Sequence, residues 1–509
     1  MKNLLILASL TLTLSVISPF PFALPNFLLL SLLALSLNFW LIPGGFAWRS
    51  HHRLLPGPAG WPILGTLPQM GPLAHRNLAA IAHSLKATRL MSFSLGANRA
   101  VISSHPETAK EILCGPAFSD RPIKQSARLL MFERAIGFAP NGTYWRHLRR
   151  IAAQHMFSPR RISDLEGLRR NVADEMAAEV GMAAEGVVRL REVLQKHSLR
   201  NIIESVFGSG LEMGTKEELS DIVREGYELI AEFNWEDYFP LRFLDFGGVK
   251  RKCHELGRRV NVVVGRIVEQ RKTQPNAQSH SHFNNDFLAS LLTLPKEDRL
   301  SDSDMVAVLW EMIFRGTDTV AILIEWIMAR MILHPEIQAK AQKELDTCVG
   351  CNKHVRDSDI PNLRYLQAIV KEVLRMHPPG PLLSWARLAI DDVHVDKVLI
   401  PAGTTAMVNM WAIAHDPSIW EDPWAFRPER FMEEEVSVMG SDLRLAPFGA
   451  GRRVCPGKAL GLATVQLWVA SLLQEFIWLP SSSNSVNLSE CLKLSLEMKE
   501  PLNCRVVSR

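Results

Sequence analysis

A single cysteine near the C-terminal end of the chain has neighbours that would make it reactive. Cys455 lies in the segment Phe448 to Gly457, which reads F-G-A-G-R-R-V-C-P-G and precedes an apolar helical pattern from Ala459 to Leu473. Arginines and a helix N-terminus lower the pKa of a thiol, and the thiolate is the form that binds metals. The segment therefore suits an anionic sulfur ligand to iron. The alternative is an ordinary buried cysteine in a tight turn.

A second group of candidate residues lies in the middle of the longest helical pattern, which runs from Ser301 to about Leu333. Its centre contains Gly316, Asp318 and Thr319, and a glycine and polar residues inside a buried helix need a reason. As an acid–alcohol pair, Asp318 and Thr319 could pass protons to dioxygen while its O–O bond breaks. The alternative is a structural kink in which Thr319 bonds a backbone carbonyl.

Two further patterns combine polar residues at helical spacing. Glu372 and Arg375 lie three residues apart, on one face of a predicted helix from Leu363 to Met376. Trp145 and Arg149 lie one turn apart, and the forked donors of an arginine suit a carboxylate. Taken alone, each pattern is also typical of a solvated helix face.

Together these segments resemble the cytochrome P450 family. The cysteine segment is similar to the family's haem-ligand loop, F-x-x-G-x-R-x-C-x-G, and the helix centre to its oxygen-activation motif, A/G-G-x-D/E-T. The resemblance implies haem b with Cys455 as the axial iron ligand, and Thr319 with Asp318 as the catalytic pair. It also implies contacts to the haem carboxylates from Trp145, Arg149, Arg387, Arg453 and Arg121, and a buried network below the cysteine loop of Glu372, Arg375 and Arg430.

The sequence departs from the family motif at Arg315, where a small residue is usual. Arg315 precedes Thr319 by four residues and therefore shares its helix face. A guanidinium in an apolar substrate pocket is costly unless it is paired. We expect either an internal partner, Glu311 or Asp318, or a substrate carboxylate clamped by two parallel hydrogen bonds. The internal pair is favoured because its partners already lie at helical spacing.

The elements that must hold these residues are mainly helical. Strand patterns cluster in Leu90 to Ser103 and Ala386 to Val408, beside many segments of helical period. The resemblance specifies the P450 fold, a triangular helical domain with a long central helix over the haem and with small β-sheets. A net charge of +4 over 509 residues gives no case for nucleic acid. Seven scattered cysteines favour a reducing compartment, and the lone C-x-x-C of Cys348 and Cys351 is interpreted as a solvated turn.

The N-terminal segment is typical of a membrane anchor. No charged residue occurs from Asn3 to Trp48, and prolines separate two apolar runs there. A cleaved signal peptide is the competing interpretation. Basic residues from Arg49 onward favour a cytosolic position for the rest of the chain. We expect an anchor in the endoplasmic reticulum membrane (1–45), a basic and proline-rich hinge (46–70) and a haem-thiolate catalytic domain (71–509).

Within the family, the chain resembles the plant A-type enzymes, and most closely the KLUH/PLASTOCHRON-type growth regulators. Three stretches carry this likeness: Asp120 to Ala127, Phe233 to Pro240 and Glu311 to Thr319. The likeness implies a monooxygenase that inserts one oxygen atom from dioxygen into a small lipophilic substrate, such as a fatty acid or a related growth-signal precursor. Its electrons would come from NADPH through NADPH-cytochrome P450 reductase.

Two other functions stay open on the sequence alone. One is a P450-like isomerase or dehydratase that needs no external oxygen, and the other is a non-catalytic haem sensor. The intact pair of Asp318 and Thr319 argues against the first, because such an enzyme has little use for proton delivery to dioxygen. The expected anchor argues against the second. NADPH consumption linked to product formation would separate all three functions.

Overall fold

The computed structural model describes residues 42–51, 55–182, 186–239, 245–273, 286–350, 353–383, 386–481 and 486–509. Nearly all of the expected membrane anchor lies outside these ranges. Among the residues that the structure does describe, no helix combines the length and the apolar character needed to cross a bilayer. The anchor therefore stays a prediction.

The segment that was expected to be a hinge is partly held on the first strand of the domain. Trp48 is fully buried, and its Nε1 donates a hydrogen bond to the carbonyl oxygen of Phe93 at 2.8 Å. Further along, the carbonyl oxygen of Pro56 accepts the Ser92 N–H at 2.9 Å. Residues between 46 and 70 therefore also belong to the packed surface of the domain.

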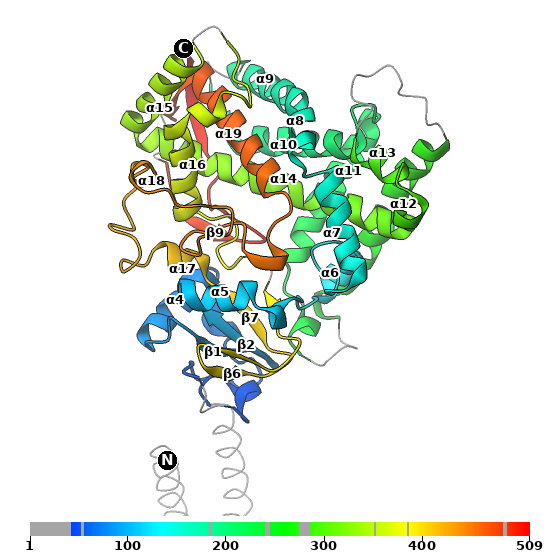
Figure 1. Cartoon of the computed structure of the whole chain (residues 1–509), viewed down its shortest axis with the longest axis vertical. Coiled ribbons are helices and arrows are strands. Elements are labelled where there is room, and N and C mark those ends of the chain that lie inside the picture. Colours follow the sequence, from blue (N-terminus) through cyan, green and yellow to red (C-terminus); the bar gives the residue numbers. More distant parts are fainter. Residues whose placement is uncertain are drawn as a thin grey trace, which may run out of the picture.

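The domain is mainly helical with small sheets, which confirms the expected fold class. Figure 1 shows the helices as a broad body, with the sheet that contains β1, β2 and β7 at its lower end. The helices are α3 (Leu67–Met70), α4 (Ala74–Ser84), α5 (Pro106–Cys114), α6 (Gln125–Leu129), α7 (Thr143–His155), α8 (Pro159–Asp164), α9 (Glu166–Met182), α10 (Leu190–Phe207), α11 (Met213–Ala231), α12 (Val249–Thr273), α13 (Phe287–Leu292), α14 (Asp302–Leu333), α15 (Pro335–Cys348), α16 (Arg364–Met376), α17 (Met410–Ala414), α18 (Arg430–Glu433) and α19 (Lys458–Glu475).

The strands form small sheets; β1, β2 and β4 to β7 lie where the sequence pattern predicted strands, whereas β3 and β8 to β11 were not predicted. The largest has the order β1-β2-β7-β4, in which β2 and β7 run parallel and the other neighbours antiparallel. A second sheet, β3-β11-β8, joins the C-terminal strand to the middle of the chain. The strands are β1 (Met91–Leu95), β2 (Asn98–Ser103), β3 (Val188–Arg189), β4 (Arg387–Leu388), β5 (Val393–Val395), β6 (Val398–Ile400), β7 (Thr405–Val408), β8 (Phe476–Pro480), β9 (Glu490–Leu492), β10 (Leu496–Met498) and β11 (Asn503–Ser508).

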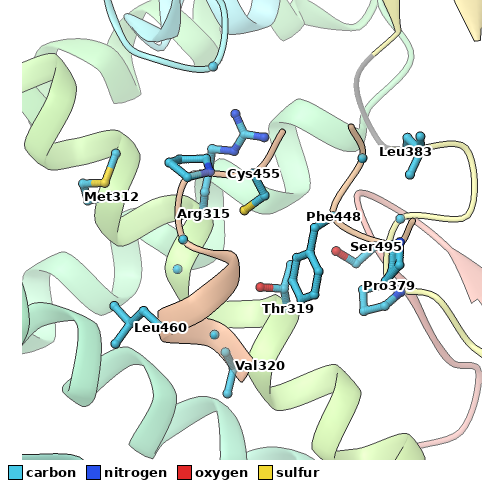
Figure 2. Close-up of a pocket in the computed structure, with 18 of the residues that line it drawn as sticks. Met312, Arg315, Thr319, Val320, Pro379, Leu383, Phe448, Cys455, Leu460 and Ser495 are labelled. Carbon is cyan, nitrogen blue, oxygen red and sulfur yellow. The ribbon is translucent and has the colours of Figure 1, made fainter. Parts of the chain in front are cut away.

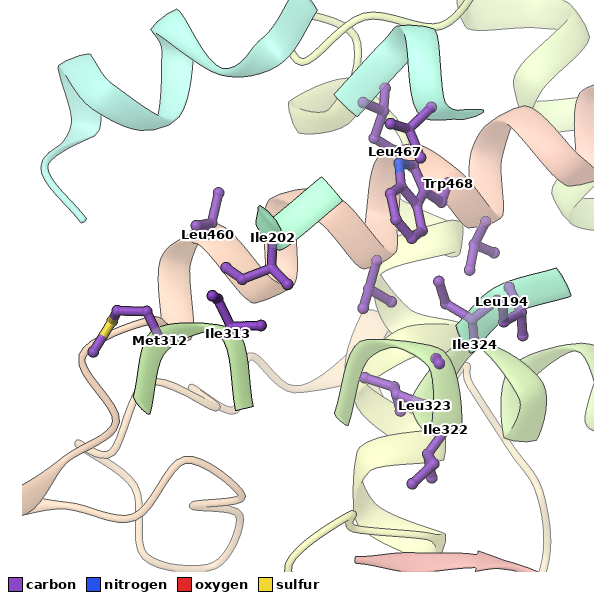
Figure 3. Packing of buried hydrophobic residues seen from close by; sticks show 14 of the residues in the cluster. Leu194, Ile202, Met312, Ile313, Ile322, Leu323, Ile324, Leu460, Leu467 and Trp468 are labelled. Atoms are coloured by element: carbon purple, nitrogen blue, oxygen red, sulfur yellow. The ribbon is translucent and has the colours of Figure 1, made fainter. Parts of the chain in front are cut away.

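Helix α14 crosses the centre of the domain and supplies much of its core (Figure 1). Its start is capped as the sequence predicted, since the Ser301 hydroxyl accepts the Asp304 N–H at 3.2 Å. Its end comes just before Pro335, which cannot continue the helix. Trp310 and Trp326 are completely buried along its length, so the helix is surrounded by other elements. Figure 3 shows Ile313 of α14 beside Ile202 of α10 and Leu460 of α19, and Ile324 of α14 beside Leu194 of α10.

The glycine at the centre of α14 permits the close approach of α10. A Cβ atom at Gly316 would lie 2.7 Å from Cγ1 of Ile202, which is too close for any side chain. Beside it, the Ser198 hydroxyl donates to the carbonyl oxygen of Thr317 at 2.5 Å, and the Thr317 hydroxyl donates to the carbonyl of Ile313 at 2.8 Å. Part of the polar character of this helix therefore serves helix–helix contact.

A buried ion network lies between α16 and the chain that leads to the cysteine loop. Arg375 donates to both carboxylate oxygens of Glu372, at 2.8 and 2.9 Å, and Arg430 Nε donates to Glu372 Oε1 at 3.2 Å. Arg375 also donates to the carbonyl oxygens of Ala414 and Pro423, at 2.7 and 2.8 Å. The network therefore fixes the path of the chain between α17 and α18.

We predict that Glu372→Gln strongly destabilises the domain. Glu372 and Arg375 have fully buried side chains, so the change leaves two guanidinium groups without their carboxylate. Breaking a buried pair in this way typically costs about 3–5 kcal/mol. The measurement is the urea dependence of unfolding of the purified protein. Glu255→Gln, which removes an exposed partner of Arg258 at the same i, i+3 spacing, is the control and should leave the midpoint unchanged. Similar midpoints for the two variants would contradict a supporting role.

Candidate functional site

A cavity of about 300 Å³ brings together the cysteine loop and the centre of α14. Figure 2 shows Cys455, Arg315 and Thr319 around it, with Phe448 from the loop between them. Much of the remaining wall is apolar: Ile136, Ile202, Met312, Val320, Leu323, Leu374, Pro379, Leu383, Leu460, Val465 and Leu494.

Backbone contacts and glycines set the shape of the cysteine loop. The Cys455 N–H donates to the carbonyl oxygen of Phe448 at 2.9 Å, which closes the loop. Gly449 and Gly451 have φ angles of +69° and +67°, in the left-handed region that favours glycine. A Cβ at Gly451 would also lie 2.2 Å from the carbonyl oxygen of Leu113. The loop places Cys455 just before the N-terminus of α19, where a helix dipole stabilises a thiolate.

Two of the predicted arginines are bound to the chain around the cysteine. Arg149 on α7 donates from Nη2 to the carbonyl oxygen of Val454 at 2.6 Å. Arg453 donates from Nε to the carbonyl of Ser119 and from Nη2 to that of Ala139, both at 2.7 Å. Burial lowers the pKa of Arg149, and it lowers the pKa of Arg453 to about 10. Both cations therefore lie in a region poor in solvent.

Trp145 makes its contacts within the protein, to a backbone carbonyl and to Arg453. Its Nε1 donates to the carbonyl oxygen of Ile136 at 3.0 Å, and Trp145 is not among the residues that line the cavity. The guanidinium carbon of Arg453 lies 4.3 Å from the centre of the Trp145 ring, close enough for a cation–π contact. Trp145 therefore supports Arg453 from behind.

Arg121 and Arg387 line the cavity with unsatisfied donors. In each side chain, Nε and Nη1 are buried and have no hydrogen-bond partner among the described residues. The Nη2 groups donate to the carbonyl oxygens of Arg453 and Ala450, at 3.4 and 3.2 Å. Burial lowers the pKa of Arg387 to about 10 and lowers that of Arg121 well below its ordinary value. Such groups favour an anionic hydrogen-bond partner, and no described residue accepts a hydrogen bond from these nitrogens.

This set of donors fits haem. The apolar walls suit a planar macrocycle, Cys455 suits its iron, and the unsatisfied N–H groups of Arg121 and Arg387 suit its carboxylates. Within the described parts of the chain, no group of three or more His, Cys, Asp or Glu residues could hold a bare metal ion.

The structure separates the two residues of the expected acid–alcohol pair. Thr319 lines the cavity, whereas Asp318 lies on the neighbouring face of α14 and accepts a hydrogen bond from Gln195 of α10 at 3.4 Å. Burial, together with the negative charge of Glu497, raises the pKa of Asp318 to about 6. Asp318 can therefore exchange protons near neutral pH without touching the cavity.

Arg315 lines the cavity and has the first of its two expected internal partners. Its Nη1 donates to Glu311 Oε1 at 3.1 Å, across one turn of α14. Asp318, the other expected internal partner, points towards α10 instead. The sequence prediction of an internal pair therefore corresponds to the observed geometry.

Several residues that close the cavity could not be found from the sequence. Asn201 and Tyr227 come from α10 and α11, Ser495 comes from the turn between β9 and β10, and Gly137 comes from the loop before α7. None belongs to a motif. Only the packing of these elements around α14 brings them to one place.

The domain is mainly helical, and its cysteine loop, buried arginines and apolar walls meet at one cavity. These features define a haem-thiolate protein. The comparison with known proteins then identifies the family. The family model described as Cytochrome P450 matches residues 55–504, and the chain belongs to that family. It is therefore a P450 monooxygenase, with haem b as its cofactor and a reductase as its source of electrons.

The chain is similar to plant proteins over nearly its full length. It is 53% identical to Cytochrome P450 78A5 of Arabidopsis thaliana over 494 residues, which is 94% of each chain. It is 50% identical to Cytochrome P450 78A3 of Glycine max, over 94% of this chain and 93% of that one. Flavonoid 3'-monooxygenase CYP75B3 of Oryza sativa subsp. japonica is 35% identical, over 95% and 97% of the two chains. The expected likeness to the plant KLUH-type group is thereby confirmed.

A solved structure of a zebra fish cytochrome P450 with abiraterone has the same fold. Its TM-score to this chain is 0.73 at 25% identity, and the match covers 86% of this chain and 100% of the other. The family and the fold thus agree with the geometry of the cavity.

We predict that Asp318→Asn stabilises the protein at neutral pH but not in acid. With its pKa raised to about 6, Asp318 binds its proton more tightly in the folded than in the unfolded state. Its ionisation therefore lowers stability above that pH, and the penalty vanishes below about pH 4, the ordinary range of an aspartate. The free energy of unfolding should rise by roughly 2–3 kcal/mol at neutral pH.

Denaturant unfolding at neutral pH and near the ordinary aspartate pKa measures this effect. Asp221→Asn, at an exposed position of α11, is the matched control and should show no such pH dependence. A gain for Asp318→Asn that is equal at both pH values would contradict the burial of an ionisable carboxyl.

Proposed function

We propose that this P450 inserts one oxygen atom from dioxygen into a small lipophilic substrate, with a fatty acid or a related growth-signal precursor as the candidate class. The observation that carries the proposal is the cavity shared by Cys455 and Thr319, whose wall is otherwise largely apolar. An apolar wall with a few polar groups favours a lipophilic ligand held in one orientation. The name of the rice flavonoid 3'-monooxygenase describes the same type of reaction in a relative.

In this proposal Cys455 would hold the haem iron through its sulfur. Bound haem supplies the activation of dioxygen and the transfer of one oxygen atom to the substrate, while the other atom leaves as water. Arg121 and Arg387 bind the haem carboxylates through their unsatisfied N–H groups, and Arg149 and Arg453 hold the loops around them.

Thr319 and Asp318 handle protons from different positions. The Thr319 hydroxyl faces the cavity and can both accept and donate a hydrogen bond, so it holds a proton at the reacting side. Asp318 acts behind it, because a carboxyl with a pKa near 6 exchanges protons readily at the pH of the cytosol.

We place the protein at the endoplasmic reticulum membrane, with the anchor (1–45) in the bilayer and the hinge (46–70) and catalytic domain (71–509) on the cytosolic side. NADPH-cytochrome P450 reductase is the proposed electron source. All six cysteines in the described part of the chain are free, which is typical of a reducing compartment.

Exposed arginines around the cysteine loop offer a surface for this partner. Arg146, Arg160 and Arg452 are exposed, and Phe157 next to α8 contacts Gly457, so α8 lies beside the loop. A basic surface of this kind steers an acidic flavoprotein towards the haem. Two other basic residues of this region are already engaged, since Arg150 pairs with Asp298 at 2.5 Å and Lys458 Nζ donates to the carbonyl of Met439 at 2.7 Å.

The test of the ligand assignment is Cys455→His. The reduced carbon monoxide complex of the wild type should absorb at the long wavelength typical of a thiolate ligand, because the anionic sulfur donates electron density to iron. The variant should absorb at a shorter wavelength and lose NADPH-dependent product formation. Cys348→Ser, at an exposed cysteine, is the control and should match the wild type. An unchanged absorption band in Cys455→His would refute the assignment.

We predict that Arg160→Glu slows haem reduction by the reductase. Reversing an exposed charge beside the cysteine loop weakens electrostatic steering, so the rate should fall severalfold at low salt and the difference should shrink at high salt. Stopped-flow reduction under carbon monoxide measures the rate. Arg505→Glu, on exposed β11, is the matched control and should leave the rate unchanged. A loss of rate that does not depend on salt would point to a structural cause.

A further inference from the structure

The Arg315–Glu311 pair forms a bridge between α14 and the loop that precedes α7. Glu311 Oε1 accepts hydrogen bonds from Arg315 Nη1 at 3.1 Å and from the Gly137 N–H at 2.8 Å. The Glu311 side chain is 2% exposed, whereas that of Arg315 is 31% exposed and lines the cavity. The buried carboxylate therefore holds the guanidinium at the cavity surface (Figure 2).

Only glycine fits at the far end of this bridge. A Cβ atom at Gly137 would lie 2.1 Å from Arg315 Nη1 and 2.2 Å from Glu311 Oε1. Any side chain there would displace the ion pair from its present position. The bridge is therefore built from three residues that depend on one another.

The charge balance of the bridge limits what can bind beside Arg315. Glu311 Oε2 is buried and has no hydrogen-bond partner among the described residues, and Arg315 is the cation in direct contact with this carboxylate. A substrate carboxylate at Arg315 would have to share that guanidinium with Glu311. Two carboxylates at one site oppose each other's ionisation. An anionic group is therefore disfavoured at this position.

A purely hydrocarbon substrate is disfavoured at the same place for a different reason. Filling the cavity with apolar surface would remove water from the exposed part of the Arg315 guanidinium, and the loss of that solvation is unfavourable. An uncharged oxygen can accept a hydrogen bond there without adding a second negative charge. Thr319 lies on the same helix face, one turn or about 5.4 Å along the axis, so this oxygen would lie near the reacting part of the cavity.

We propose that Arg315 recognises an uncharged oxygen of the substrate, such as a hydroxyl, carbonyl or ester oxygen, close to the position that is oxidised. Glu311 and Gly137 are positioning residues that hold Arg315 and balance its charge. The inference rests on the proposed monooxygenase function and assigns a polar contact to its apolar cavity. If the substrate is a fatty acid, its carboxylate lies away from Arg315.

Spectral binding titrations of the haem-loaded full chain test this contact, with dodecane, methyl dodecanoate and ionised dodecanoate as probes. The ester should bind the wild type at least roughly tenfold more tightly than the hydrocarbon, which is the typical effect of a hydrogen bond to a charged group. It should also bind more tightly than the acid anion. A wild type that prefers the acid anion to the ester would overturn the proposal in favour of a carboxylate clamp.

Two variants separate recognition from folding. Arg315→Met alone would strand the buried Glu311 carboxylate, so the change is made together with Glu311→Gln, whose amide oxygen can still accept the Gly137 N–H. This double variant should lose the preference for the ester over the hydrocarbon. Glu311→Gln alone leaves Arg315 without its balancing charge, and it should gain roughly tenfold in affinity for the acid anion while the ester is unaffected.

The matched control is Arg258→Met made together with Glu255→Gln, which removes an exposed ion pair of α12 outside the cavity and should keep the wild-type order of affinities. An ester preference that survives in the double variant would overturn the proposal, because the polar contact would then lie elsewhere. The carbon monoxide spectrum of each variant is recorded in parallel. A wild type that shows the thiolate spectrum but no ester preference would refute the role of Arg315 and leave the proposed monooxygenase function intact, whereas absence of that spectrum in the wild type would refute the function itself.

Discussion

The burial of guanidinium groups is the constraint on which the rest of this structure depends. An arginine removed from water must have its donors satisfied by a carboxylate or by carbonyl oxygens. Arg375 meets this requirement completely, through Glu372 and backbone carbonyls. Arg121 and Arg387 do not, and their unsatisfied nitrogens face the cavity beside Cys455. The same requirement therefore explains both what stabilises the domain and where it needs a cofactor.

A short backbone segment, Ile136 to Ala139, connects the two walls of the cavity. Its carbonyl groups accept hydrogen bonds from Trp145 and from Arg453, which precedes the cysteine by two residues. Its Gly137 N–H donates to Glu311 of α14. One loop thus holds the arginine beside the proposed iron ligand and the ion pair on the opposite wall. Hydrogen bonds through this loop therefore connect the two walls of the cavity.

Helix α14 uses successive residues for different tasks because successive side chains point in different directions around a helix. Gly316 makes room for α10, and Thr317 bonds back into its own helix. Asp318 faces the polar groups of α10, while Thr319 and Arg315 face the cavity. A single motif therefore combines helix packing, a buried ionisable group and the lining of the site. This is why its residue types appear unfavourable when they are judged as an isolated helix.

The sequence by itself determined the elements and the motifs, because these depend on local spacing. Helical period, the Ser301 cap and the glycines around Cys455 act within a few residues, so the central helix and the cysteine loop could be predicted. Tertiary structure alone decided which donors remain unsatisfied, that Trp145 supports Arg453, and that Asp318 and Thr319 face different surroundings. Those outcomes depend on burial and on partners distant in the chain, such as Gly137 for Glu311, and no local pattern records which distant groups will meet.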